Sequence, residues 1–202
     1  EGGETLGYEM IAAEDVPALD RVVIQVGGGA LASAIIQSFT EAVAFGVVTR
    51  LPRFHAVQTR GAFPLKRAYD RVAQRIDEVV TASGAQPAAA TASARQYAAT
   101  HRSAFMWPWE DEPRSIAHGI LDDETYDWLA VVTGMLASGG GPVVVDEPVL
   151  VEARDLARET TGIHVDHTGA AGLAGLMQMV REGSVGPREN IAVIFSGVER
   201  GV

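Results

Sequence analysis

Three consecutive glycines follow a short apolar run near the start of the sequence, an order of residue types that can bind an anion. Residues 22–26 are mostly β-branched and apolar, which predicts a buried parallel strand, and an apolar pattern with helical spacing follows the glycines. The residues at the turn are Gly27, Gly28, Gly29, Ala30 and Leu31. Glycine allows close backbone approach, and the free amides of a helix's first turn favour phosphate. We therefore predict a phosphate site here, with a tight ligand-free turn as the alternative.

A hydroxyl side chain occupies a comparable place near the end of the sequence. Residues 191–195 form another apolar run, and Ser196 and Gly197 follow it. Ligands of open parallel sheets bind at the carboxyl ends of the strands, so this serine and the glycine turn are expected at the same edge. A phosphate at one strand end and a ring nitrogen at the other suit a small phosphorylated heteroaromatic cofactor, because a hydroxyl can donate or accept a hydrogen bond. The alternative is that Ser196 only caps its strand.

Histidines, acids and tryptophans supply further candidate groups. His118 could contact a substrate carboxylate or transfer a proton, and the alternative is a histidine held at a helix start. Residues 164–167 contain two histidines and an aspartate without a recognisable metal-ligand spacing, so we expect no metal site there. The acids at residues 122–124 are expected to cap a helix. Trp107 and Trp109, which flank a proline, are expected to pack in a core or interface.

The hydrophobic pattern predicts the elements that must position these groups. Apolar runs predict strands at residues 22–26, 54–58, 142–145 and 191–195. Helical spacing predicts helices at residues 5–13, 30–44, 65–80, 124–136, 149–159 and 168–181. Residues 81–94, rich in small and polar types, are expected to form a loop, with a helix at 93–101. Strands alternating with helices predict one α/β domain over residues 1–202, a three-layer sandwich with a mostly parallel sheet.

The charge balance argues against two classes of partner. Lys and Arg total 16 against 26 Asp and Glu, so the formal net charge is -10. Because an acidic surface repels nucleic acid and anionic membranes, we expect neither as a partner. The absence of cysteine excludes disulfides and thiolate metal sites, and no apolar run approaches the ~20 residues of a membrane span. The first residues show no signal-peptide pattern. We expect a cytoplasmic protein.

Four segments follow one another along the chain, at residues 22–34, 115–120, 168–173 and 191–197. In this order they resemble segments of the fold type II pyridoxal-phosphate enzymes, which include threonine synthase, serine/threonine dehydratase and tryptophan synthase β. Residues 1–9 are also similar to the family's segment before the phosphate loop. The resemblance implies that the chain is the large-domain part of such an enzyme, with pyridoxal 5'-phosphate as cofactor. It implies that residues 27–31 hold the phosphate and that Ser196 hydrogen-bonds the pyridine nitrogen. A neutral hydroxyl would leave that nitrogen unprotonated and the ring a weaker electron sink.

The chain departs from this family at functionally important positions. The family's Schiff-base lysine lies far upstream of the glycine loop, whereas the only lysine here, Lys66, lies downstream on the polar side of a predicted helix. The chain therefore resembles the C-terminal half of such an enzyme, and an N-terminal half, separate or cleaved, is the expected partner. His118 replaces the acid of a dehydratase-like Ala-Asp-Gly step, and Gln58 replaces a glutamate, which weakens the case for a divalent cation. A small amino-acid substrate, β- or γ-elimination or replacement, and a homo-oligomer are further implied.

Two other functions stay open on the sequence. Residues 27–32 also fit a G-x-G-x-x-A dinucleotide pattern, although no ribose-binding acid is evident about 20 residues on. A non-catalytic binding module that keeps the fold would explain the missing lysine. Pyridoxal phosphate binding without turnover would favour that module, and activity restored by an N-terminal fragment would exclude it.

Overall fold

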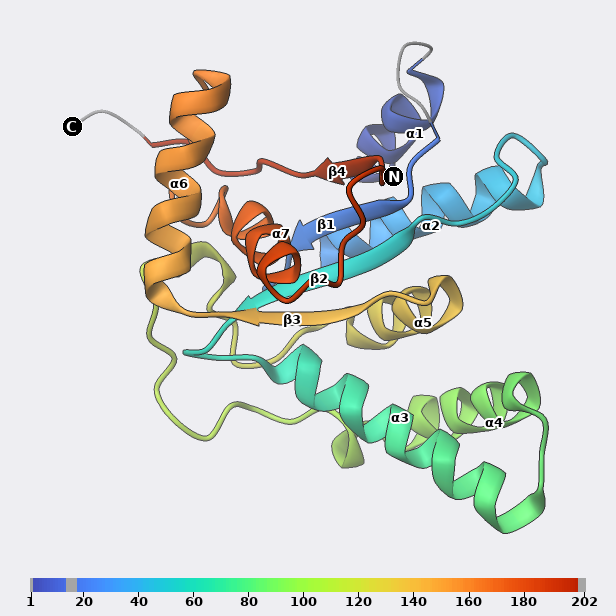
Figure 1. The fold of residues 1–202 in the computed structure, drawn as a ribbon. Coiled ribbons are helices and arrows are strands. Elements are labelled where there is room, and N and C mark those ends of the chain that lie inside the picture. The colour runs from blue at the N-terminus through green and yellow to red at the C-terminus, as the bar shows by residue number, and fades with distance from the viewer. Residues whose placement is uncertain (1, 14–17, 200–202) are drawn as a thin grey trace.

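The computed structural model describes residues 2–13 and 18–199 and shows a parallel sheet with helices on both faces (Figure 1). The four-stranded sheet has the order β3-β2-β1-β4, and every strand pair in it is parallel. The strands are β1 (Arg21–Gln25), β2 (Arg53–Thr59), β3 (Gly141–Val145) and β4 (Ile191–Val193). Each overlaps an apolar run that predicted a strand, so the predicted three-layer α/β fold is confirmed.

The helices divide between the two faces of the sheet. They are α1 (Glu4–Ala12), α2 (Ala30–Ala44), α3 (Pro64–Ser83), α4 (Pro87–Thr100), α5 (Trp128–Ser138), α6 (Glu147–Thr161) and α7 (Ala171–Arg181). Helices α6 and α7 cover one face, and α2 and α5 cover the other (Figure 1). Because side chains alternate along a strand, Val22 and Ile24 enter the core under α2, whereas Val23 packs toward α7. Because β1 contributes side chains to the core on each face of the sheet, its central residues are apolar on both faces.

Residues 81–94 do not form the loop that the sequence predicted. Helix α3 continues to Ser83 and ends at Gly84, whose φ of 64° is left-handed, and α4 begins at Pro87. The buried residues of α4 are Ala90, Ala94 and Ala98. Alanine is the best helix former, but a stripe of it among Ser and Thr gives little hydrophobic contrast, so the periodicity missed the first half of α4.

Two other helices begin later than predicted because polar residues before them make tertiary hydrogen bonds. Helix α5 begins at Trp128 and not at residue 124, since the Thr125 hydroxyl bonds to the loop after β1. Helix α7 begins at Ala171 and not at residue 168, since Thr168 Oγ1 accepts the amide of Gly119. These bonds draw two distant segments toward the carboxyl edge of the sheet.

The strand order creates a topological switch between β1 and β4. After β1 the chain moves to β2 and then β3 on one side, and it later returns to β4 on the other side. The loops that leave β1 and β4 therefore diverge from neighbouring strand ends, which is where open parallel sheets bind ligands. The glycine turn follows β1, and Ser196 follows β4.

No helix in the described part of the chain is long and apolar enough to cross a bilayer.

Candidate functional site

The glycine loop joins the carboxyl end of β1 to the first turn of α2. The amide of Val26 donates to the carbonyl of Val57 at 2.8 Å, and the sheet pairing ends there. Gly29 precedes the helix with a φ of 96°, a left-handed conformation that favours glycine, and no side chain caps α2. Among residues 2–13 and 18–199, no acceptor is found for the amides of residues 27–31. A row of free donors at a helix N-terminus can bind an anion.

The segment that precedes α5 fixes the loop by bonding to its carbonyl groups. The buried Thr125 hydroxyl donates to the carbonyl of Gly27 at 2.9 Å. The amide of Asp127 donates to the carbonyl of Gly28 at 3.0 Å, and Ser33 Oγ donates to the Asp127 carboxylate at 2.7 Å. Because the carbonyls are engaged on this side, the loop is held in shape while its amides stay unpaired.

The same segment packs closely against residues 27–29, most tightly at Gly27. A Cβ on Gly27 would lie 2.3 Å from an oxygen of the Asp122 carboxylate, and one on Gly28 would lie 3.2 Å from the Tyr126 ring. Because residues 27–29 have no side chains, the segment before α5 can pack against the loop. The glycines therefore serve this packing contact as well as any ligand. The half-buried Asp122 also places a negative charge beside the free amides, which weakens their attraction for an anion.

Ser196 lies just past β4, on the strand that neighbours β1. Its side chain is exposed, and its Oγ accepts a hydrogen bond from Nε2 of Gln25, the last residue of β1. Gly197 packs tightly, because a Cβ there would lie 2.3 Å from an oxygen of Asp166. The structure thus places Ser196 and the glycine loop at the same edge of the sheet, as the sequence predicted, and on neighbouring strands, which the sequence did not specify.

Gln25 is a polar residue of the site that the sequence analysis missed. It is 5% exposed, and its Oε1 is buried without a hydrogen-bond partner among the described residues. The available signal was a single amide in the otherwise apolar run at residues 22–26. A buried polar group in a strand is costly unless it is paired, so it indicates a specific role.

His118 lies in a short 3₁₀ helix at residues 118–120, whose Ile120 packs against Gly27 of the glycine loop, and its side chain is exposed. It borders one cavity of about 440 Å³ with Arg114 and Glu147, and a second of about 460 Å³ with His167 and Thr168. Burial lowers the pKa of His167, and the Arg154 charge lowers it further. Both histidines therefore line hollows at this surface.

The other polar candidates have structural partners. Gln58 is buried, and its Oε1 accepts the amides of Leu65 at 2.9 Å and Lys66 at 3.1 Å, so it caps α3. The Lys66 ammonium pairs with Asp70 at 2.6 Å. Asp166 accepts the amide of Gly169 at 2.6 Å. Within the residues that the structure describes, no group of three or more His, Cys, Asp or Glu could hold a metal ion.

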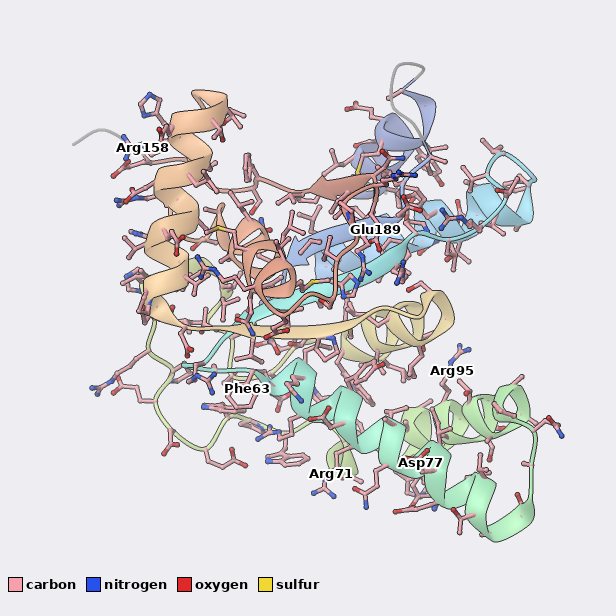
Figure 2. All side chains as sticks on the ribbon, viewed as in Figure 1. Phe63, Arg71, Asp77, Arg95, Arg158 and Glu189 are labelled. Carbon is pink, nitrogen blue, oxygen red and sulfur yellow. The ribbon has the colours of Figure 1, made fainter. Side chains whose placement is uncertain are left out.

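Trp107 and Trp109 are half-buried and pack against side chains at the start of α3 rather than in the hydrophobic core, which was one of the two placements that the sequence predicted. Trp109 lies against Phe63 with ring centroids 4.5 Å apart. The Arg67 guanidinium lies 3.8 Å from the centre of the Trp107 ring and also pairs with Glu110 at 2.8 Å. These contacts attach the segment after α4 to the start of α3. Figure 2 shows the start of α3, where Phe63 is labelled.

Comparisons with curated proteins identify relatives along nearly the whole chain. The chain is 28% identical to threonine synthase from Methanosarcina acetivorans, over 98% of this chain and 41% of the relative. It is 25% identical to threonine synthase from Methanocaldococcus jannaschii, with the same coverage. The chain thus spans 41% of the length of these relatives.

Solved structures show the same fold. The T.th. threonine deaminase superposes with a TM-score of 0.66 at 21% identity, over 100% of this chain and 58% of that chain. A fungal L-serine ammonia-lyase from Rhizomucor miehei gives a TM-score of 0.66 at 16% identity, over 98% of this chain and 51% of that chain. A family model described as "Pyridoxal-phosphate dependent enzyme" matches residues 1–197. The chain therefore belongs to the pyridoxal-phosphate dependent enzyme family and has the fold type II architecture.

Proposed function

We propose that this chain is the C-terminal, phosphate-binding part of a pyridoxal-phosphate enzyme similar to threonine synthases and dehydratases. The enzyme would act on a small amino acid by β- or γ-elimination or replacement. One observation carries the proposal: the amides of residues 27–31 have no acceptor in the described part of the chain, and they lie at the switch point of the sheet. The positive end of the α2 dipole adds to their attraction for a phosphate.

The residues fit the cofactor at two points and oppose it at one. The free amides match the phosphate oxygens, and the Ser196 hydroxyl at the neighbouring strand end can donate to a ring nitrogen. The Asp122 carboxylate beside Gly27 opposes an anion by charge. When bound, pyridoxal phosphate supplies an electron sink for chemistry at an amino acid. His118, which borders both cavities at this edge, is the candidate for contact with the substrate.

The catalytic lysine of the proposed enzyme lies outside this sequence. Lys66 is the only lysine here; it lies in α3 and pairs with Asp70, while its backbone amide is held by Gln58. We infer that the lysine belongs to the N-terminal half of the same enzyme, present as a separate or cleaved chain. A homo-oligomer and a cytoplasmic location belong to this proposal as well.

An exposed strand edge offers a place for that half to attach. Strand β4 (Ile191–Val193) is the last strand of the sheet beside β1, and its apolar side chains are only partly buried. Unpaired backbone groups and apolar side chains at a sheet edge favour the addition of another strand.

The test is reconstitution with the lysine-bearing half of the parent enzyme. The two chains would be co-expressed with pyridoxal phosphate, reduced with borohydride and analysed by mass spectrometry, with a Lys→Ala form of the partner as control. The proposal expects a phosphopyridoxyl adduct on the partner's lysine, and turnover of an amino acid by the unreduced complex. Failure of the chain to bind pyridoxal phosphate, alone or in the complex, would contradict it.

A non-catalytic binding module is the second candidate, and the position of Lys66 favours it. Cofactor binding by this chain without adduct or turnover in the complex would support that function. The dinucleotide alternative gains nothing from the structure, because the side chain near the end of β2 is the buried Gln58, which caps α3.

A further inference from the structure

Gln25 lies directly behind Ser196, at the point where β1 and β4 end. Its side chain belongs to the central strand, and only 5% of the residue is exposed. The exposed Ser196 follows the neighbouring strand. The two residues are 171 positions apart in the sequence, so only the fold brings them together. The hydrogen bond between them therefore connects a buried side chain of β1 to an exposed side chain of the proposed site.

The direction of the hydrogen bond determines what Ser196 can do next. The Gln25 amide nitrogen donates, and Ser196 Oγ accepts. A hydroxyl carries one hydrogen and two lone pairs, so the serine keeps its own hydrogen for a partner on the exposed side. An outside partner that accepts this hydrogen must offer a lone pair, as an unprotonated ring nitrogen does.

The oxygen at the other end of the Gln25 amide, Oε1, has no hydrogen-bond partner in the described part of the chain. Helix α7 passes so close that a Cβ on Gly172 would lie 3.0 Å from this oxygen. A buried acceptor without a partner costs free energy, and natural structures keep few of them. The close packing of α7 over this oxygen therefore holds the Gln25 amide against Ser196.

Carboxylates near this end of the sheet do not take the place of Gln25. Asp166 contacts Gly197, but its Oδ1 accepts the Gly169 amide. Asp122 lies against Gly27 and Gly28. The group found hydrogen-bonded to Ser196 Oγ among the described residues is thus the neutral Gln25 amide.

We propose that Gln25 is a positioning residue that turns the Ser196 hydroxyl outward as a donor, so that the site selects a heteroaromatic ring with an unprotonated nitrogen. This inference rests on the proposed function, which places the cofactor ring at Ser196. Gln25 acts only through Ser196, and it sets the electronic state of the ring without touching it.

The test follows the ring nitrogen and needs no catalysis. Pyridoxine 5'-phosphate labelled with ¹⁵N has no aldehyde and needs no lysine. Bound to the chain, its nitrogen would be titrated with pH by ¹⁵N NMR. Wild type should keep the nitrogen unprotonated to a lower pH than the free ligand does. Q25M, which removes the donor at similar size, should raise the nitrogen's pKa by about one unit, a tenfold change in proton affinity. Q25E, whose carboxylate accepts from Ser196, should raise it further.

Controls separate this inference from the proposed function. S196A should match Q25M, and adding Q25M to S196A should cause no further shift. Gln37→Met changes an exposed amide of α2 that pairs with Glu41 and should leave the titration unchanged. If wild type does not bind the ligand, the proposed function fails. If wild type binds the ligand and the nitrogen titrates in Q25M and Q25E as it does in wild type, the role of Gln25 is refuted. If Q25M does not fold, the titration of the nearly isosteric Q25E alone decides the question.

Discussion

The hydroxyl of Thr125 donates a hydrogen bond to the carbonyl oxygen of Gly27 at 2.9 Å, across 98 residues of sequence. Thr125 Oγ1 also receives the Gln58 amide at 3.5 Å, and Gln58 in turn caps α3. One buried side chain thus connects the glycine loop after β1 to the helix after β2. This connection helps to hold the glycine loop, and with it the proposed phosphate site, in shape.

Replacing Thr125 with Val should destabilise the protein and weaken ligand binding together. Valine keeps the volume but leaves the Gly27 carbonyl without its buried donor, which costs about 1–3 kcal/mol. Urea unfolding and calorimetric titration with pyridoxine 5'-phosphate measure the two effects. Thr160→Val, on the exposed side of α6, is the matched control. Unchanged stability would show that the loop does not need this bond.

Asp122→Asn should tighten binding of a phosphate ligand. The substitution removes a negative charge that lies beside Gly27 and Gly28, and a unit charge about 4 Å away is worth roughly 1 kcal/mol even when water screens it fully, so the affinity should rise at least about fivefold. Calorimetric titration at low and high salt would measure the gain, which should shrink with salt.

The exposed neighbour Asp123→Asn makes the same change in net charge and serves as control for Asp122. Equal gains from both variants would show that only the overall charge matters. A loss of affinity in D122N would show that the carboxylate supports the loop.

Stability should fall as the pH falls from about 6.5 toward 4, because of His55. Burial, and then the Arg21 charge, lower the pKa of His55 to about 4, against a reference of 6.5. Between these values the unfolded chain binds a proton that the native state does not, so acid favours unfolding by an amount on the order of 3 kcal/mol at most. Arg21 Nη1 lies 2.9 Å from His55 Nε2, and Glu189 pairs with both Arg21 and Arg53.

Urea unfolding at several pH values in this window tests the role of His55. His55→Gln should flatten the dependence of the unfolding free energy on pH between about 4.5 and 6.5. The nearby Glu189, whose pKa is lowered chiefly by its hydrogen bond from Arg21, contributes below this window. An unchanged slope in the variant would assign the acid sensitivity to another group.

Gly175→Ala should destabilise the contact between α7 and the sheet. A Cβ at this position would lie 2.4 Å from a methyl group of Val57, which is fully buried. Overpacking of this kind costs about 1–3 kcal/mol. Gly186→Ala, where the nearest group would be at an ordinary 3.5 Å, is the control for thermal unfolding. Equal melting temperatures for the two variants would contradict this packing.

The strands and the position of the glycine loop could be predicted because their signals are local. Residues 22–26 are apolar without a break except for Gln25, and three glycines follow them. Helix α4 was missed in part because its buried face is alanine, which differs little in hydrophobicity from its neighbours. The Gln25–Ser196 bond and the approach of Asp122 to Gly27 join distant segments. No local pattern specifies such contacts, since they depend on how the segments pack.

The amides of residues 27–31 are the direct test of the account. In a ¹H–¹⁵N correlation spectrum titrated with pyridoxine 5'-phosphate, these amides should shift strongly, with Ser196 following. Inorganic phosphate should shift the loop alone. Shifts confined to other parts of the chain, or none at saturating ligand, would show that the glycine loop does not hold the cofactor's phosphate.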